Sequence, residues 1–261
     1  MKYPYLFCLT VFVAAATACD AQAVRSGLAD VAIIDCDTGA ALGTHYYHGE
    51  YWVAGKPGTR YAVEVGNRIG ERLLAVMSVD GVNVVSGATA AWDQAGYVFA
   101  PGDRYEITGW RKNDSEVAAF TFTDSPNSYA VRTGRPANVG VIGVAIFRER
   151  QAQPHYVAPP TGQSSERAQA SHPTAMPPPM LPAPLSGPKL GTGHGEREYS
   201  FVNHTDFLRM QAQPNEVVRI HYDSLENLLA MGIVSRARPA WPQADPFPGS
   251  SEQRYVPDPP G

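Results

Sequence analysis

The chain has 261 residues and a net charge of −4, and only 18% of its residues are charged. A nucleic-acid-binding protein normally presents a basic face, so this composition argues against that class. Most of the 23 prolines lie within residues 151–190 and 237–261. We therefore expect folded parts that are separated and followed by proline-rich segments.

The N-terminal segment, residues 1–23, has the order of a secretory signal peptide. Lys2 precedes an apolar run over residues 5–16, and Ala21-Gln22-Ala23 forms a small-residue cleavage site. No other apolar run approaches the ~18 residues of a membrane span, so no transmembrane segment is expected after signal removal. We expect an exported protein of the periplasm or cell envelope.

A second cleavage site competes with the first. Ala16-Thr17-Ala18-Cys19 resembles a bacterial lipobox, although its first position holds Ala in place of a branched aliphatic residue. Cleavage there would leave Cys19 for lipidation, and its acyl chains would anchor the protein to a membrane. The soluble form is the favoured interpretation. It leaves Cys36 without a cysteine partner for an internal disulfide.

The segment over residues 30–150 is rich in strand signals. Its apolar runs are short, carry β-branched and aromatic residues, and are separated by turn residues. Seven or eight antiparallel strands in about 110 residues predict a mainly β fold, an antiparallel β-sandwich with a jelly roll as one variant. The predicted strands are residues 45–53, 60–67, 71–79, 82–87, 96–100, 104–110, 116–124 and 139–147.

Turn residues support this interpretation. Asp80-Gly81 separates two apolar runs and tolerates positive φ at both positions, which predicts a tight hairpin. Pro101-Gly102-Asp103 predicts a second turn. The run over residues 139–147 is apolar on both faces, so we expect a central strand that is covered on both sides.

Four stretches of the chain resemble a family of uncharacterised bacterial proteins, many of which are secreted. They read LAVMSVDGVNVVSG, GYVFAPGDRYEITGWRK, AAFTFTDSPNSYAVRTGRPANVGVIGVAIFRER and LGTGHGEREYS. The resemblance covers residues 60–150 and 189–234. It narrows the expected fold, and it implies no activity, cofactor or catalytic residue.

Residues 151–190 form a proline-rich linker, which we expect to be disordered or extended like polyproline. Such segments are common docking strips for partners. The last segment, residues 237–261, is predicted to be a disordered proline-rich tail.

A second ordered segment is predicted over residues 191–236. Its strand-like runs predict a β-hairpin that turns at Gln213-Pro214-Asn215, and a short helix follows. Asp223 or Ser224 is the expected N-cap of that helix, and Gly232 its C-cap. A hairpin and one helix bury too little apolar surface to fold alone, so we expect the element to dock on the sandwich or on a partner.

Residues 191–200, GTGHGEREYS, raise the question of a phosphate-binding loop. Such a loop follows a strand and opens a helix whose amides face the anion. Here a proline-rich segment precedes the glycines and a strand follows them. We interpret the glycines as positions where the chain turns sharply to rejoin the folded body.

His204 and His221 are the candidate metal ligands. If the predicted hairpin turns near Pro214, their rings lie almost opposite each other, with Asp206 and Asp223 nearby. Two imidazoles and a carboxylate can hold zinc. The favoured interpretation is that both are ordinary surface histidines, and no cofactor is predicted.

Trp92, Tyr97, Trp110 and Arg111 form the candidate ligand-binding set. Sandwiches often present aromatic rings to sugars, although packing in the core is the commoner role of such rings. Trp92 lies in the loop-like stretch AAWDQAG, so it is expected on the surface. Arg111 would add a polar contact.

These features favour an exported envelope or periplasmic binding or assembly protein without catalytic activity, whose partner is an envelope protein or a glycan. The alternative is a hydrolase or metal-dependent enzyme that acts on cell-wall or extracellular polymer, with His194, His204 and His221 as its candidates. No G-x-S-x-G motif is present, and no catalytic residue is predicted. A purely structural lipoprotein would require acylation of Cys19.

The mature N-terminus distinguishes the two processing routes. We expect mass spectrometry of the exported protein to find cleavage after Ala23, because Ala21-Gln22-Ala23 meets the small-residue rule. An acylated Cys19 at the N-terminus would contradict the soluble route and establish a membrane anchor.

Overall fold

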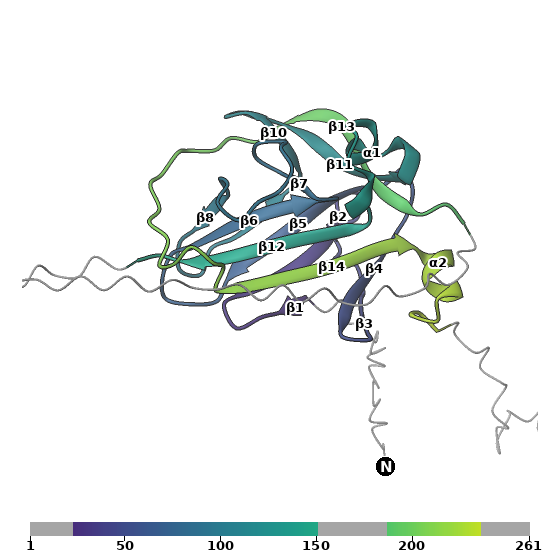
Figure 1. Cartoon of the computed structure of the whole chain (residues 1–261), viewed down its shortest axis with the longest axis horizontal. Helices are drawn as coiled ribbons and strands as arrows, with labels where there is room; N and C mark the ends of the chain where they lie inside the picture. The colour runs from purple at the N-terminus through teal and green to yellow at the C-terminus, as the bar shows by residue number, and fades with distance from the viewer. Residues whose placement is uncertain (1–22, 151–186, 236–261) are drawn as a thin grey trace, which may run out of the picture.

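The computed structural model describes residues 23–150 and 187–235. They form a β-sandwich in which two sheets face each other across one apolar core (Figure 1). The mainly β sandwich is therefore confirmed. Cys19, the tail, and nearly all of the predicted signal peptide and of the linker lie outside the described residues. Within those residues, no helix is both long and apolar enough to cross a membrane.

The first sheet, sheet A, has the strand order β1-β2-β5-β11-β10. In addition, β9 pairs with β5 and β13 pairs with β11, and every pairing is antiparallel. Its strands are β1 (Val24–Arg25), β2 (Ala29–Asp35), β5 (Arg60–Asn67), β9 (Arg104–Ile107), β10 (Gly109–Asn113), β11 (Glu116–Asp124) and β13 (Leu190–Tyr199).

The second sheet, sheet B, has the order β3-β4-β14-β12-β6-β7, and β8 also pairs with β6. Only the pairing of β14 with β4 is parallel among its described strands. Its strands are β3 (Thr44–Tyr47), β4 (Glu50–Gly55), β6 (Leu73–Val79), β7 (Val82–Asn83), β8 (Tyr97–Phe99), β12 (Val141–Arg148) and β14 (Glu216–Ser224).

Short helical segments lie between β11 and β12 and after β14. They are η1 (Ser125–Asn127), α1 (Tyr129–Arg132), η2 (Pro136–Asn138) and α2 (Leu225–Ala230). The predicted helix is α2, and the Ser224 hydroxyl caps it by accepting the Asn227 N–H at 3.1 Å. Leu228 anchors it in the core, and Gly232 follows it with a φ of +72°.

Several predicted strands have the expected bounds, among them residues 60–67 and 116–124. The predicted strand over residues 45–53 is wrong, because positive φ angles at His48 and Gly49 fold it into the β3–β4 hairpin. Strand β2 was not predicted. The Asp80-Gly81 hairpin is confirmed, with φ angles of +52° and +73°.

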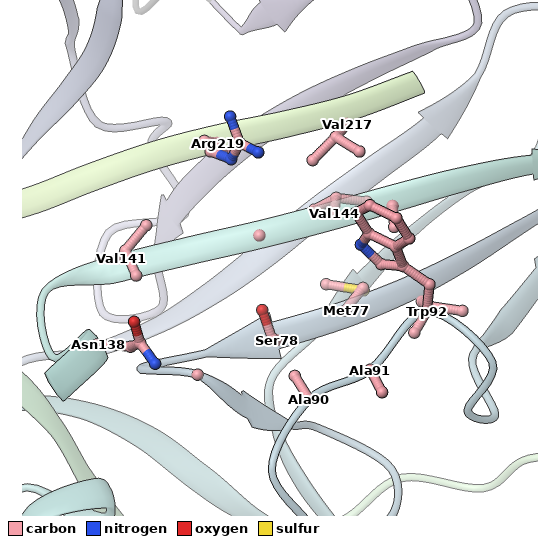
Figure 2. A pocket seen from close by; sticks show the side chains of 14 residues that line it. Met77, Ser78, Ala90, Ala91, Trp92, Asn138, Val141, Val144, Val217 and Arg219 are labelled. Carbon is pink, nitrogen blue, oxygen red and sulfur yellow. The ribbon is translucent and has the colours of Figure 1, made fainter. Parts of the chain in front are cut away.

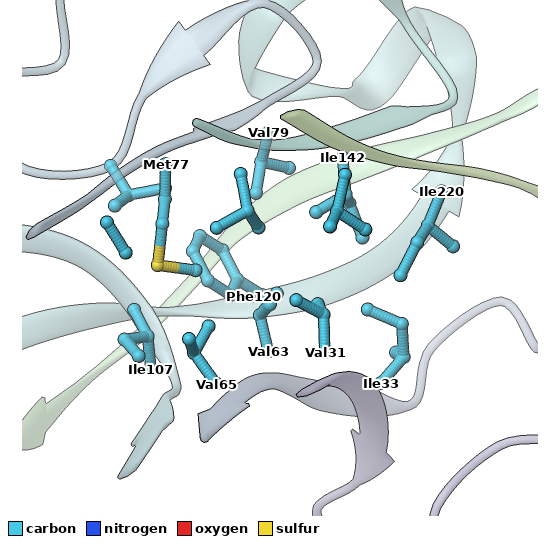
Figure 3. Close-up of a cluster of buried hydrophobic side chains, with 14 of the residues drawn as sticks. Val31, Ile33, Val63, Val65, Met77, Val79, Ile107, Phe120, Ile142 and Ile220 are labelled. Carbon is cyan, nitrogen blue, oxygen red and sulfur yellow. The ribbon is translucent and has the colours of Figure 1, made fainter. Parts of the chain in front are cut away.

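The core lies between the two sheets and is built by alternation along each strand. Figure 3 shows Val63 and Val65 of sheet A facing Met77 and Ile142 of sheet B, with Phe120 between them. All five side chains are buried. Inward-facing residues of both sheets thus fill one continuous core, and burying them is the main source of the fold's stability.

The hairpin predicted within residues 191–236 is wrong. Strand β13 pairs with β11 in sheet A, whereas β14 is inserted between β12 and β4 in sheet B. Residues 200–215 connect the two sheets mostly without regular structure. Each of the two strands is hydrogen-bonded to strands of a different sheet, so the segment is an integral part of both layers.

The glycines of GTGHGEREYS lie inside β13 itself, so the predicted sharp turn there is wrong. A Cβ at Gly191 would lie 2.6 Å from the Cβ of Ser128, and one at Gly195 would lie 2.8 Å from the carbonyl oxygen of Ala119. These glycines allow β13 to pass very close to the α1 region and to β11.

A buried polar network joins residues 187–235 to residues 23–150. The Asp80 carboxylate accepts the backbone N–H groups of Gly140 at 2.9 Å and Thr192 at 2.8 Å, and the Tyr222 hydroxyl at 2.5 Å. The Thr192 hydroxyl lies 2.6 Å from the hydroxyls of Tyr222 and Tyr61. Asp80 is fully buried, and its burial raises its pKa despite these donors.

Substitution of Asp80 tests this network. Asp80→Asn keeps a residue that tolerates positive φ, but its amide nitrogen must face at least one N–H or O–H donor. We expect the free energy of unfolding in urea to fall by about 1–3 kcal/mol. Asp93→Asn, in an exposed loop, is the control and should change it by less than about 0.5 kcal/mol. Equal stability of the two variants would contradict the role given to Asp80.

Candidate functional site

A groove with a volume of about 230 Å³ lies on the outer face of sheet B. Strands β6 and β12 form its floor. Figure 2 shows Ala90, Ala91 and Trp92 on one side and Val217 and Arg219 of β14 on the other. The groove is therefore formed by a loop from residues 23–150 together with strand β14 from residues 187–235.

The alternation of β14 places two of these side chains outside. Val218, Ile220 and Tyr222 point into the core and are buried. Val217 and Arg219 consequently point to the outer face, because successive side chains of a strand lie on opposite sides. Arg219 is exposed there.

The floor of the groove depends on small side chains. Gly143 of β12 is the ladder partner of both Ser78 and Arg219, so these three residues form one row across the sheet. A Cβ at Gly143 would lie 2.9 Å from the Ser78 hydroxyl oxygen. The prediction that residues 139–147 are covered on both faces is right for Phe147, which is buried, and wrong for Gly143, which is partly exposed.

Trp92 is 48% exposed, as expected from its loop-like surroundings. The side chain of Gln94 holds the loop by accepting the Ala91 N–H and donating to the Thr89 carbonyl, both at 2.9 Å. Arg209 donates to the carbonyl oxygens of Trp92 and Gln94. The indole is thus presented on a backbone that is fixed before any ligand arrives.

Arg219 is the one charged side chain among the described residues that line the groove. It makes no ion pair within residues 23–150 and 187–235, and its charge helps to lower the pKa of His221. Ser78 and Asn138 present a hydroxyl and an amide without hydrogen-bond partners in the described part of the chain. The groove therefore offers a cation and two neutral polar groups to a ligand.

Trp110, another member of the predicted set, is not available to a ligand. It is 2% exposed and packs against Phe120, Tyr129 and His194, with ring centroids 4.9, 4.9 and 6.3 Å away. The strand predicted over residues 104–110 breaks before Gly109, which turns Trp110 into the core. The predicted contact of Trp110 with a ligand would therefore require this buried ring to become exposed.

Tyr97 and Arg111 lie together, away from the groove lining. The Arg111 guanidinium donates to the Tyr97 hydroxyl at 3.2 Å and to the hydroxyl and carbonyl oxygens of Ser200. These bonds fix the start of the connection between β13 and β14. The polar groups of Tyr97 and Arg111 are thus used within the fold, and neither residue lines the groove with Trp92.

The two predicted metal ligands have different neighbours. His204 Nε2 lies 3.0 Å from Asp114 Oδ1, and His221 Nε2 lies 3.5 Å from Glu50 Oε1. The hairpin that would have placed them opposite each other is not formed. Across the described ranges, no three His, Cys, Asp or Glu side chains are arranged to hold a metal ion.

His221 belongs to an aromatic row on the outer face of sheet B. Val141, His221, Trp52 and His45 are successive ladder partners across four strands, and the His221 ring stacks on Trp52 with centroids 4.8 Å apart. Burial lowers the pKa of His221, and the nearby Lys189 and Arg219 lower it further against the opposing effect of Glu50. His221 is therefore largely neutral at pH 7.

Cys36 has the properties of a packing residue. Its thiol is partly buried beside the small core formed by Ala32, Ile34 and Ala62. Burial raises the pKa of this thiol to about 11, and the Glu198 carboxylate adds to the effect. Very little thiolate is present near neutral pH, so Cys36 is a poor nucleophile.

The comparisons with known proteins give no assignment. No protein-family model, no curated protein and no solved structure matches the chain.

Arg219, Ser78, Asn138 and Gly143 were not predicted as site residues from the sequence. A signal for Arg219 was present in VVRIHY, where the period of two places Val217, Arg219 and His221 on one face. No local pattern indicated that this face would meet the Trp92 loop, because β14 and β12 pair across about 75 residues of sequence.

The pH dependence of stability tests the environment of His221. Its pKa is lower in the folded chain than the ordinary ~6.5, so its contribution is fully present above pH 6.5 and is lost as pH falls through the folded pKa. His221→Phe keeps an aromatic ring and removes this titration. We expect the free energy of unfolding to fall less steeply between about pH 6.5 and 5 in this variant. Identical slopes in the two proteins would contradict the lowered pKa.

Proposed function

We propose that this chain is an exported, non-catalytic binding protein of the cell envelope and that the groove on sheet B holds part of an envelope glycan. The half-exposed indole of Trp92 beside the groove is the observation that carries this proposal. Sugar rings have an apolar face that packs on an aromatic ring and hydroxyl edges that need polar partners. The groove supplies both kinds of contact.

The floor of the groove favours recognition by side chains. The backbone groups of β6, β12 and β14 are consumed by their own ladders along the floor. An extended peptide usually binds by adding a strand to a free sheet edge, and the middle of a sheet offers it no backbone partners. A ligand with hydroxyl groups can instead use the side chains of Ser78 and Asn138.

The size of the groove favours one unit of a polymer. Its volume of about 230 Å³ lies below the ~300–1,000 Å³ of most small-molecule pockets. A shallow groove of this size, open to the surface, can accept a single ring while the rest of a chain continues outside. Binding a glycan chain in this way needs no enclosed cavity.

No observation favours the hydrolase alternative. His194, His204 and His221 lie beside different neighbours, and none of them lines the groove. The buried carboxylate of Asp80 is occupied by donors from the backbone and from Tyr222. Export to the envelope is part of the proposal, and it is supported by the signal-like order of residues 1–23.

Substitution of Trp92 tests the proposal. The protein without residues 1–23 is applied to an array of neutral and acidic oligosaccharides, and a glycan that it retains is titrated by calorimetry. Trp92→Ala removes the stacking surface, so we expect roughly tenfold or greater loss of affinity. Tyr105→Ala removes an aromatic side chain that is 53% exposed on sheet A, and it should change the affinity less than about twofold.

Two results would overturn the proposal. One is the absence of any retained glycan, in which case the protein has another class of partner. The other is unchanged affinity in Trp92→Ala, which would place the binding site elsewhere. Circular dichroism of both variants checks that they are folded.

A further inference from the structure

We infer that the groove selects an acidic sugar unit, whose carboxylate is bound by Arg219 while its ring lies against Trp92. This inference rests on the proposed function, because it specifies which glycans the groove accepts. It is carried by the charge of the groove and by the positions of the two side chains across it.

The groove lining carries one positive charge and no negative charge among the described residues. The whole chain, in contrast, has a net charge of −4. An anionic ligand is therefore attracted locally to Arg219 and gains little from the rest of the surface. A guanidinium also presents paired N–H groups that match the two oxygens of a carboxylate.

The neighbours of Arg219 do not neutralise it. The nearest acid on β4, Glu50, lies 3.5 Å from the His221 ring nitrogen and forms no ion pair with Arg219. The guanidinium charge is also felt by His221, whose pKa it helps to lower. Another arginine, Arg209, is occupied in donating to the carbonyl oxygens of Trp92 and Gln94.

The arrangement across the groove fits one ring. Arg219 extends from β14 on one side and Trp92 from its loop on the other, and Ser78 of β6 lies on the floor of the groove (Figure 2). Asn138 lies on the same surface at one end of the groove. A sugar ring packed on the indole can thus direct a carboxylate toward Arg219 and hydroxyl groups toward Ser78 and Asn138.

Matched glycans test this inference. The array carries oligosaccharides with hexuronate, sialate or muramate units, each next to a form in which the carboxylates are methyl esters. We expect the protein to retain at least one acidic form and to bind its ester roughly 10- to 100-fold more weakly, the range for a hydrogen bond to a charged group. Raising the salt concentration should weaken binding of the acidic form and leave binding of the ester unchanged.

Substitutions then locate the carboxylate. Arg219→Gln should lower the affinity for the acidic glycan by a similar factor and leave the affinity for the ester unchanged. Arg219→Lys should keep part of the affinity for the acidic glycan, because lysine supplies a positive charge without the paired N–H groups. Arg25→Gln is the control, because Arg25 is an exposed arginine on β1 of sheet A.

The outcomes separate the inference from the proposed function. Equal binding of acid and ester, or equal loss of both in Arg219→Gln, overturns the acidic specificity while glycan binding stands. Retention of no glycan overturns both. Loss of affinity in Arg25→Gln equal to that in Arg219→Gln would show a general charge effect and would overturn the role of Arg219.

Discussion

The buried carboxylate of Asp80 is the constraint on which the rest of the structure depends. It sits in the tight turn between β6 and β7 and receives donors from the start of β12, from β13 and from β14. A buried carboxylate without these donors would be costly, so the turn and the three strands must be correctly placed together. This requirement fixes residues 187–235 against the strands that precede residue 150.

The candidate site follows from that constraint. Strand β14 is fixed between β12 and β4, so its outward-facing side chains lie on the same sheet face as those of β12 and β6. Arg219 therefore lies in one row with Gly143 and Ser78. The connection before β14 supplies Arg209, which holds the loop that carries Trp92. Neither segment alone contains the groove, so folding of the whole sandwich is what creates the surface that we propose as the binding site.

Local sequence patterns were sufficient for much of the fold. The Asp80-Gly81 turn, the strands over residues 60–67 and 116–124, and helix α2 each follow from short-range rules of turn chemistry, alternation and capping. The pairing of β13 and β14 was not predictable in this way, because it depends on partners far away in sequence. No local pattern indicated that Asp80 would be a buried hydrogen-bond acceptor as well as a turn residue.

The candidate site, like the fold, was predictable from the sequence only where local patterns decide a residue's position. Trp92 was expected on the surface from its loop-like neighbours, and it is there. Trp110 was assigned to the same set, but the break in its strand turns it into the core. Tyr97 and Arg111 bind each other and Ser200, a contact that only the folded chain reveals. Arg219 is a candidate because β14 and the Trp92 loop line the same groove in the folded chain.

The most direct test of the groove as the binding site is to follow the tryptophan indole N–H signals by NMR while the protein is titrated with a glycan that it retains. We expect the indole signal of Trp92 to shift in a saturable way and the signal of buried Trp110 to stay in place. Saturable binding in which the Trp92 signal does not move would contradict the assignment of the groove as the binding site.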